Sequence, residues 1–436
     1  MIAEYLKAYI LYPVLEKTLL RRILVKLEII KKYGKISLPV RLVLRKKKLA
    51  DVLRMAKENV PYYRELFRKL NFDPGKVEKD TSYLNELPYL DKNIIIEQGP
   101  RLLNKKYTRD SLHIRKTGGS TGPSTLIYYS QSALDWTAAA NLLVFEWAGK
   151  KRHMREAQLS NRQPNLEPWE NRLKERLKCL AMNRTNILTD IFDKDSLAKI
   201  WERLKKAKPY LIQGHPSTLY ALALFLKGNN ETAEGILKVF ESTGEVLDKK
   251  KRETIEDAFS CEVFDRYGNA EFGVVSHELK DPKGKQKVLD FITWPEILNL
   301  ENGINEIVLT GLTNDAMPLI RYRTGDLGKL EVCEDGFYLK DIQGRVHDIV
   351  KIGDKNYPTH YIQDLLDKIG GVAEFQLELK DSLLPLLRIA LSDANAKGAI
   401  TERINALWLG KIVLEFTDFA GLKRVGWREK FRYVVQ

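Results

Sequence analysis

The sequence has little of what builds a disulfide-rich or metal-held protein. Its 436 residues include three cysteines, Cys179, Cys261 and Cys333, which lie far apart along the chain. Such spacing fits neither a disulfide framework nor a zinc ligand set, and the six histidines are equally scattered. We therefore expect no structural metal, and we take a reducing cytoplasm as the default compartment.

Long apolar runs are also missing. No uninterrupted apolar stretch reaches the roughly 18 residues that a transmembrane helix needs. Glu4, Lys7 and Glu16 interrupt any signal-peptide core near the N-terminus. There is no internal repeat and no low-complexity linker. A hydrophobic content of 44% with 30% charged residues indicates an ordinary globular protein, and the length allows two or three domains.

Acidic residues are scarce only at the N-terminus. Residues 1–57, called the arm from here on, contain 15 Lys and Arg against four Asp and Glu, whereas the rest of the chain has 57 against 54. The net charge of +14 is therefore mostly local, and we predict no nucleic-acid surface. Apolar residues recur in the arm at helical spacing, and Pro13 is expected to break or kink the first helix. Such an arm either docks on its own domain with a solvated basic face or makes peripheral contact with an anionic membrane.

Helical and β-prone segments alternate through the middle of the chain. We expect helices over 44–70, 131–148, 195–207, 216–227 and 248–259, and strands near 124–129, 210–213, 238–241 and 262–265. This alternation predicts an α/β fold with a parallel sheet. From 286 to 345 the pattern is mostly β with glycine turns, and a smaller α+β segment closes the chain.

The most informative stretch is the glycine- and hydroxyl-rich segment 116–124, KTGGSTGPS. Such a segment can form a loop whose backbone N–H groups and hydroxyls converge on a phosphate. A surface turn of the same composition is an equal alternative. The spacing matches neither the P-loop nor the dinucleotide-binding glycine fingerprint.

Four later segments supply the chemistry that such a loop lacks. Residues 267–273, YGNAEFG, place a tyrosine and the carboxylate of Glu271 at a strand end, where they suit a purine and a phosphate-bound Mg²⁺. Asp326, at the end of RYRTGD, suits ribose hydroxyls. Arg345 offers a fixed cation for phosphate, and Lys430 offers a mobile one. Taken alone, each segment is explained equally well as a turn, a helix cap or a solvated surface segment, without any functional role.

In this order the segments resemble the adenylate-forming superfamily, in the branch of the phenylacetate–CoA ligases and related capsule-biosynthesis and deazaflavin-coenzyme adenylating proteins. The matching segments are VPYYRE (60–65), LPYLDK (87–92), TGGSTG (117–122), GHPS (214–217), YGNAE (267–271) and AMPLIRYRTGD (316–326). The resemblance implies a large adenylation domain over 1–345, with α/β sheet subdomains and a β-rich subdomain. It also implies a small, mobile α+β lid over 346–436.

The resemblance also implies a two-step reaction and a role for each matching residue. A carboxylic acid attacks the α-phosphate of ATP, giving an acyl-adenylate and pyrophosphate, and a thiol, usually that of CoA, then displaces AMP. The implied phosphate contacts are Thr117, Ser120, Thr121 and Gly122, with Mg²⁺ on Glu271. The other implied contacts are Gly244, Glu245, Tyr267 and Gly268 at the adenine, Asp326 at the ribose, Arg345 near the hinge residue His347, Lys430 for adenylation, and His215 and Asn269 in the acid pocket.

The chain departs from the family pattern at four positions. Gly118 replaces a serine, Ala270 a hydroxyl residue, His347 an Asp or Lys, and Glu429 the glycine before the lysine. Three hypotheses therefore stay open: an acid–CoA ligase, an adenylating protein that passes the acyl group to an amine or sugar in polysaccharide or coenzyme biosynthesis, and a non-catalytic homologue that binds nucleotide or a partner. The sequence does not name the acid, and it leaves a homodimer open.

Overall fold

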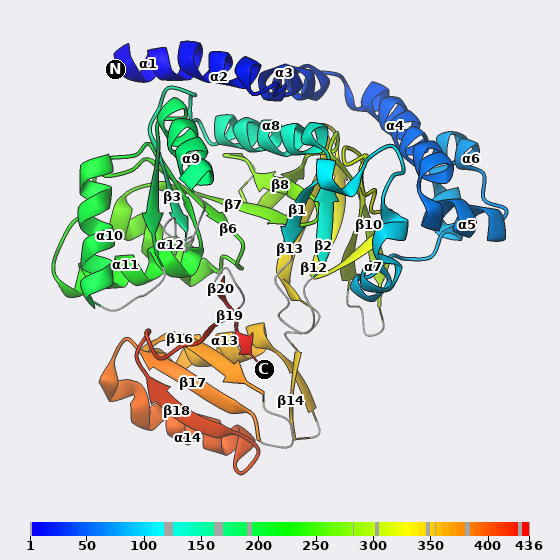
Figure 1. Ribbon diagram of the computed structural model, residues 1–436. Coiled ribbons are helices and arrows are strands. Elements are labelled where there is room, and N and C mark those ends of the chain that lie inside the picture. Colours follow the sequence, from blue (N-terminus) through cyan, green and yellow to red (C-terminus); the bar gives the residue numbers. More distant parts are fainter. Residues whose placement is uncertain are drawn as a thin grey trace.

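The computed structural model describes residues 2–116, 125–160, 169–189, 194–281, 283–300, 305–345, 349–353, 355–379, 384–425 and 430–435. Figure 1 shows two bodies. The large unit, residues 2–345, surrounds a long sheet. The C-terminal unit, residues 349–435 and coloured orange to red, lies beneath it.

An 11-stranded sheet runs through the large unit in the order β10-β11-β12-β13-β9-β8-β7-β6-β5-β3-β4. The five strands from β7 to β4 are parallel, and the others are antiparallel. The bounds are β3 Glu156–Ser160, β4 Arg184–Leu188, β5 Leu211–Gly214, β6 Val239–Thr243, β7 Glu262–Asn269, β8 Gly273–Glu278, β9 Lys285–Val288, β10 Thr293–Asn299, β11 Asn305–Gly311, β12 Tyr322–Cys333 and β13 Gly336–Arg345. The predicted α/β fold is confirmed.

Helices cover both faces of the parallel strands. On one face α3 (Ile23–Gly34) and α8 (Gln131–Trp147) pack on Leu211 and Val239. On the other face α10 (Lys194–Ala207), α11 (Pro216–Gly228) and α12 (Lys249–Phe259) pack on Ile212 and Phe240. Burial on both faces explains the apolar residues of β5 and β6. Ser130 caps α8 and Asp248 caps α12, each side chain accepting a backbone N–H bond.

The arm is a series of helices along one side of the large unit (Figure 1). It comprises α1 (Ile2–Leu6), the π-helical turn η1 (Lys7–Leu11), α2 (Tyr12–Thr18), α3 and most of α4 (Leu38–Asn59). Pro13 does not end the helical path, contrary to the expected break. It lies in the first turn of α2, directly after the π turn, where a missing N–H is tolerated. Among the described helices, none is both long and apolar enough to span a bilayer.

Shorter elements connect the arm to the sheet. The expected helix over 44–70 is divided at Val60, because the residue before a proline avoids helical geometry. The remaining elements of the large unit are α5 (Pro61–Lys69), α6 (Pro74–Lys79), η2 (Thr81–Glu86), α7 (Lys92–Gln98), η3 (Gly99–Leu102), η4 (Arg109–Ser111), β1 (His113–Lys116), β2 (Leu126–Tyr129) and α9 (Trp169–Ala181).

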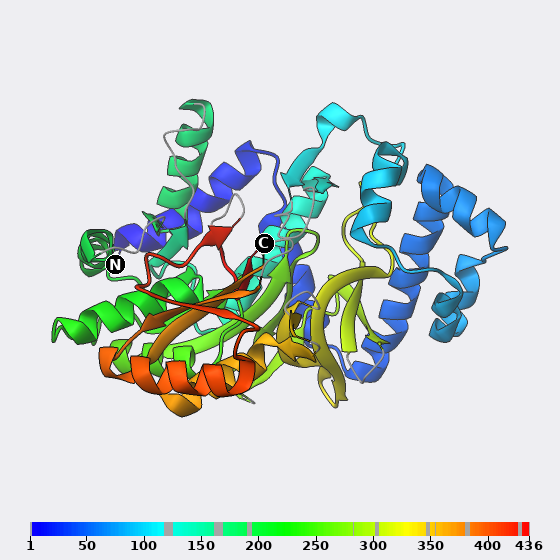
Figure 2. The same cartoon turned by 90° about the horizontal axis from the view of Figure 1, so that it is seen from below.

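The C-terminal unit has its own sheet and core. Four strands in the order β18-β17-β16-β21 form, with two helices, a core around Phe375, Ile400 and Trp408. Viewed from below, in Figure 2, this unit lies over the parallel part of the large sheet. The bounds are β14 Ile349–Ile352, β15 Lys355–Pro358, α13 Thr359–Ile369, β16 Val372–Glu378, β17 Leu386–Leu391, η8 Ala394–Ala396, α14 Lys397–Trp408, β18 Val413–Thr417, β19 Arg424–Val425, β20 Lys430–Phe431 and β21 Val434–Val435.

Candidate functional site

The predicted site residues of the parallel strands share one edge of the sheet. Gly214 of β5 pairs with Ser242 of β6, and Thr243 of β6 pairs with Arg266 of β7. The carboxyl ends of these three strands therefore lie side by side, and open α/β sheets bind ligands at that edge. The residues found there are His215 after β5, Gly244 and Glu245 after β6, and Tyr267, Gly268 and Asn269 at the end of β7.

Glu245 connects this edge to the C-terminal unit. Its carboxylate accepts a backbone N–H bond from Ser217 at 3.2 Å and another from Phe431 at 2.9 Å. Burial alone would raise its pKa, but the charges of His215 and Arg424, together with these bonds, hold the pKa of Glu245 below its ordinary value. Glu245 therefore holds two elements together, a role that its predicted place beside adenine did not include.

His215 and Gly244 flank Glu245 in a compact turn. His215 begins α11, and its Nδ1 lies 2.8 Å from the carbonyl oxygen of Thr243. Gly244 has a φ of +83°, a conformation that glycine adopts at no steric cost. The chain can therefore turn sharply between β6 and Glu245.

Tyr267, Asp326 and Arg345 meet although they are distant in sequence. The Tyr267 hydroxyl donates a hydrogen bond of 2.7 Å to Oδ2 of Asp326. Asp326 on β12 is in turn the cross-strand partner of Arg345 on β13. Burial and the nearby Asp326 carboxylate raise the pKa of Tyr267 well above its ordinary value, so the phenol stays a neutral donor. Three residues predicted to contact the nucleotide therefore lie together. Tyr267 and Asp326 meet through their side chains, and the backbone of Arg345 lies beside that of Asp326.

Gly268 and Asn269 shape the backbone beside Tyr267. The β7–β8 register shifts between Tyr267 and Gly268, and a Cβ on Gly268 would lie 2.4 Å from the carbonyl oxygen of Gly273. The side-chain oxygen of Asn269 accepts a hydrogen bond from the N–H of Phe272 at 2.9 Å. Both residues therefore have structural roles in this turn, and their predicted contacts with ligands stay predictions.

Glu271 lies in the same turn, beside two tyrosines. The Tyr322 hydroxyl donates to Oε1 of Glu271 at 3.1 Å. The Tyr129 hydroxyl lies 2.7 Å from the carbonyl oxygens of both Ala270 and Glu271. Since Tyr129 belongs to the β1–β2 hairpin that carries the glycine-rich segment, this hairpin is fastened to the Glu271 turn. Glu271 and Tyr129 also line one small pocket, with Thr313 and Asn314.

Several predicted residues cannot be placed at the level of side chains. Only the backbone of Arg345 and Lys430 is described. Lys430 pairs with Val425, and its neighbour Phe431 donates its N–H to Glu245, so the Lys430 backbone lies at the same sheet edge as His215. The residues that lie outside the described part of the chain are Thr117, Gly118, Ser120, Thr121, Gly122, His347 and Glu429.

The turn that carries Asp326 depends on Glu306, which the sequence reasoning did not identify. The Glu306 carboxylate accepts bonds from the Arg323 guanidinium at 2.7 and 2.9 Å and from the N–H of Gly325 at 3.0 Å. Arg321 is buried, has a φ of +52° and donates to the carbonyl oxygens of Leu84 and Leu87. Both arginines of the RYRTGD segment are therefore structural. No local pattern marks Glu306, because its partners lie on the next strand.

A buried ionic cluster joins the two units. Lys251 on α12 lies 2.6 Å from the Glu374 carboxylate on β16, 2.6 Å from the Tyr433 hydroxyl and 3.0 Å from the Asp248 carboxylate. These four residues are called the inter-unit cluster. Burial alone would lower the pKa of Lys251, but Glu374, Tyr433 and Asp248 raise it well above its ordinary value.

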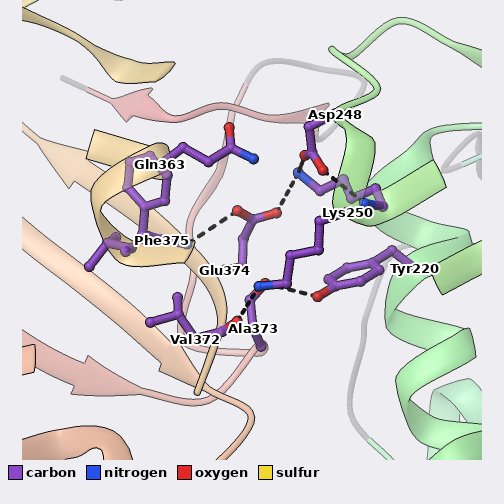
Figure 3. Close-up of a pocket in the computed structure, with 10 residues that line it drawn as sticks. Tyr220, Asp248, Lys250, Gln363, Val372, Ala373, Glu374 and Phe375 are labelled. Atoms are coloured by element: carbon purple, nitrogen blue, oxygen red, sulfur yellow. Dashed lines mark hydrogen bonds and ion pairs between the residues drawn. The ribbon is translucent and has the colours of Figure 1, made fainter. Parts of the chain in front are cut away.

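Further polar contacts flank the inter-unit cluster. Figure 3 shows Tyr220, Asp248 and Lys250 facing the strand that carries Ala373 and Glu374. The Tyr220 hydroxyl donates to the carbonyl oxygen of Ala373 at 3.2 Å, and Lys250 donates to the carbonyl oxygen of Val372. The sequence reasoning missed this interface, since each contact joins residues more than 100 positions apart.

Sequence comparison finds curated relatives of the chain. No protein-family model matches it. Protein CapK of Staphylococcus aureus is 24% identical over 331 residues, which are 73% of this chain and 70% of CapK. The phenylacetate-coenzyme A ligase of Pseudomonas putida is 23% identical over 339 residues, 74% of each chain. Over about three quarters of its length, the chain is therefore similar to members of the adenylate-forming superfamily, in its phenylacetate–CoA ligase branch.

A solved enzyme of this adenylate-forming type has the same fold. 2-Hydroxyisobutyryl-CoA ligase in its postadenylation state aligns with a TM-score of 0.73 at 18% identity, over 93% of this chain and 91% of that one. The same ligase in its thioesterification state gives a TM-score of 0.60 over the same shares. Both alignments cover nearly the whole of each chain, so the likeness in fold extends over both units.

Proposed function

We propose that the protein is an ATP-dependent acid–thiol ligase that forms an acyl-adenylate and transfers the acyl group to coenzyme A. The hydrogen bond between Phe431 and Glu245 carries this proposal. It brings the backbone of Lys430 to the sheet edge where His215, Gly244 and Tyr267 lie. We take the C-terminal unit as the mobile lid of the family, with its hinge at His347.

The proposed chemistry depends on charge and position more than on covalent help. In the first step a carboxylate oxygen of the acid bonds to the α-phosphorus of ATP, and pyrophosphate leaves with the electron pair of the broken P–O bond. In the second step the thiolate sulfur of CoA bonds to the acyl carbon, and AMP leaves. Lys430 and Arg345 would neutralise charge at the phosphates, and Asp326, held by Tyr267, would bind the ribose.

Mg²⁺ fits this site through Glu271. The Glu271 carboxylate lines a pocket and carries a hydroxyl partner, Tyr322, that orients it. Mg²⁺ commonly takes one or two protein carboxylates and completes its shell with phosphate oxygens and water. When bound, the ion would offset part of the phosphate charge. We propose this contact together with the phosphate loop of 117–122.

A different acyl acceptor is the second candidate. It rests on the resemblance to the capsule-biosynthesis adenylating proteins and on the similarity to Protein CapK. An amine or a sugar would then replace the thiol in the second step, while the first step would be unchanged.

We propose a reducing cytoplasm as the compartment for either reaction, and the three free cysteine thiols agree with it.

Pyrophosphate release tests the proposal. The protein is incubated with ATP, Mg²⁺ and a pool of carboxylic acids, with and without CoA. We expect release that needs an acid, and a drop of about 100-fold or more in Lys430→Ala, which removes the charge at the reacting phosphate. Arg403→Ala, an exposed cation on α14, is the control and should behave like the wild type.

Each other result has a definite meaning. Thioester formation when CoA is added supports the ligase, whereas acid-dependent release with no thioester supports the second acceptor. If no acid in the pool promotes release while ATP still binds, both enzymatic readings fail and the non-catalytic homologue is left. Equal rates of pyrophosphate release for Lys430→Ala and Arg403→Ala would show that Lys430 has no role in adenylation.

A further inference from the structure

The outward face of the arm is apolar. In α1, η1 and α2, residues three and four positions apart share one helical face, and Ile2, Leu6, Ile10 and Val14 are exposed on it. Tyr5 and Tyr9 are about half exposed and lie toward the large unit, where Tyr5 stacks on His153 and Arg152 lies over the Tyr9 ring. Leu19 and Leu20 follow in the turn after α2. Leu20 is 85% exposed and Ile2 is 78% exposed. A helix that only covers its own domain would place polar residues on this side.

Polar groups fasten the opposite side of the arm to the large unit. Asn183 donates to the carbonyl oxygen of Glu4 at 3.0 Å, and Arg152 donates to that of Ala8. Further along, the ammonium of Lys26 lies 2.6 Å from the carbonyl oxygen and 2.7 Å from the hydroxyl of Ser132, and Arg21 pairs with Asp135. The arm is therefore firmly docked, and its exposed apolar residues do not result from a detached helix.

The exposed side continues along α3 and α4 with apolar and basic residues. The exposed apolar side chains are Val25, Ile29, Val40, Val43 and Leu44. The exposed basic side chains of the arm up to residue 50 are Lys17, Arg22, Lys32, Lys35 and Lys47. Among residues 2–57 of the arm, all of which the structure describes, Glu28 and Asp51 are the exposed acidic residues.

Helix α9 lies beside the arm and has a similar stripe. It contacts η1, and its exposed apolar residues recur at helical spacing: Trp169, Leu173, Leu177 and Leu180. Exposed apolar patches of this extent on a soluble fold mark an interaction surface. Helix α9 therefore adds exposed apolar side chains next to the arm.

We propose that the outward face of the arm binds an anionic lipid bilayer and lies in the plane of its interface. Apolar side chains with basic neighbours are the chemistry that such an interface selects, since the apolar groups enter the headgroup region and the cations meet anionic lipids. A second copy of the chain is a poorer occupant, because a two-fold contact through this face would bring the like charges of Lys17, Arg22 and Lys32 together. The arm lies on the side of the molecule away from the C-terminal unit, so a flat membrane would leave that unit accessible (Figure 1).

Vesicle flotation with the full chain tests this proposal. Vesicles of phosphatidylcholine alone are compared with vesicles that also contain phosphatidylglycerol, an anionic lipid. We expect binding to the anionic vesicles, weakened by high salt because the attraction is partly electrostatic. The double variant Leu6→Glu, Ile10→Glu should lower the affinity roughly tenfold or more, by placing charges in the inserted face. Val332→Glu, a 61% exposed residue of β12, is the matched control and should bind normally.

A second variant keeps the test independent of folding. Lys17→Gln, Arg22→Gln, Lys32→Gln leaves the apolar face intact and should weaken binding to the anionic vesicles alone. The proposal is overturned if the intact protein ignores anionic vesicles, if it binds neutral ones equally, or if Val332→Glu loses as much as the arm variants. A dimer in light scattering that Leu6→Glu, Ile10→Glu dissociates, with no vesicle binding, would make the face an interface between copies. None of these results depends on ligase activity, so this proposal and the proposed function fail separately.

Discussion

The hydroxyl of Tyr267 and the carboxylate of Asp326 meet from strands that are not neighbours. β8, β9 and β13 lie between β7 and β12 in the sheet, so the sheet must curl to bring the two side chains together. Asp326 also receives support from its own turn, which Glu306 holds through the N–H of Gly325. The carboxylate that we assign to the ribose is therefore oriented before any nucleotide arrives, which lowers the ordering cost of binding.

Tyr267→Phe tests whether this orientation matters. The substitution keeps the ring and removes one hydrogen bond to a charged group, which is worth about 1.5 to 3 kcal/mol. We expect the KM for ATP to rise roughly 10- to 150-fold while kcat changes little, because we assign Asp326 to a part of ATP that does not react. The measurement is the ATP dependence of pyrophosphate release.

Tyr338→Phe is the control, since it removes another tyrosine–aspartate contact. The Tyr338 hydroxyl lies 2.9 Å from Asp335, at the far end of the β12–β13 hairpin. An equal rise of KM in both variants would show a general loss of stability and would remove the orienting role from Tyr267.

Single residues also show what the sequence could and could not predict about the site. Tyr267, Asp326 and Glu271 lie in short sequence motifs that resemble those of a known family. The sequence alone therefore predicts them as site residues. Glu306 and Tyr129 support those residues through contacts with other strands, and no short segment contains both partners. These supporting residues can be identified only once the pairing of the strands is known.

At the scale of elements, the parallel strands β5, β6 and β7 were predictable because each contains a short apolar pair or run next to a helical segment. β5 and β6 lead into helices, and α12 leads into β7. β3 and β4 were not. They read EAQLS and RTNIL, and the buried Glu156 pairs with the mostly buried Arg184 on the neighbouring strand, with Lys150 beside them. Charged residues suggest a surface when the sequence is read locally. They are buried here because the partner neutralises them.

The bulge at the end of β7 gives an element-scale prediction. A Cβ on Gly268 would lie 2.4 Å from the carbonyl oxygen of Gly273, so Gly268→Ala must move one strand against the other. We expect a loss of about 1 to 3 kcal/mol in the free energy of unfolding, measured by urea denaturation. A weaker affinity for ATP should accompany it, since Tyr267 is the preceding residue.

Gly228→Ala is the matched control for Gly268→Ala. Gly228 lies at the end of α11, and a Cβ there would meet nothing within 4 Å. This variant should be neutral or slightly stabilising, because alanine favours a helix more than glycine does. If Gly268→Ala were as stable as Gly228→Ala, the close approach of β7 and β8 would not constrain the turn.

At the scale of the whole molecule, the inter-unit cluster is an unusual place for an ion pair. The Lys251 and Glu374 side chains are each 4% exposed, and they belong to bodies that the family resemblance expects to move. Removing one member of a buried ion pair is strongly destabilising, because the remaining charge then has neither water nor a partner to compensate it. The cluster should therefore favour the placement of the two units seen here and oppose placements that separate Lys251 from Glu374.

Glu374→Gln tests this role of the inter-unit cluster. The substitution keeps the shape and removes the charge that faces Lys251, so the docked placement should lose about 1 to 3 kcal/mol. We expect a larger radius of gyration in small-angle X-ray scattering and several-fold slower pyrophosphate release. Transfer to CoA from added acyl-adenylate should be unchanged or faster.

Glu378→Gln is the control, because Glu378 is an equally buried carboxylate of β16 whose partners, Arg388 and Lys423, lie within the C-terminal unit. It should lower stability without changing the radius of gyration, and an equal expansion in both variants would mean that loss of stability, not release of the cluster, separates the units.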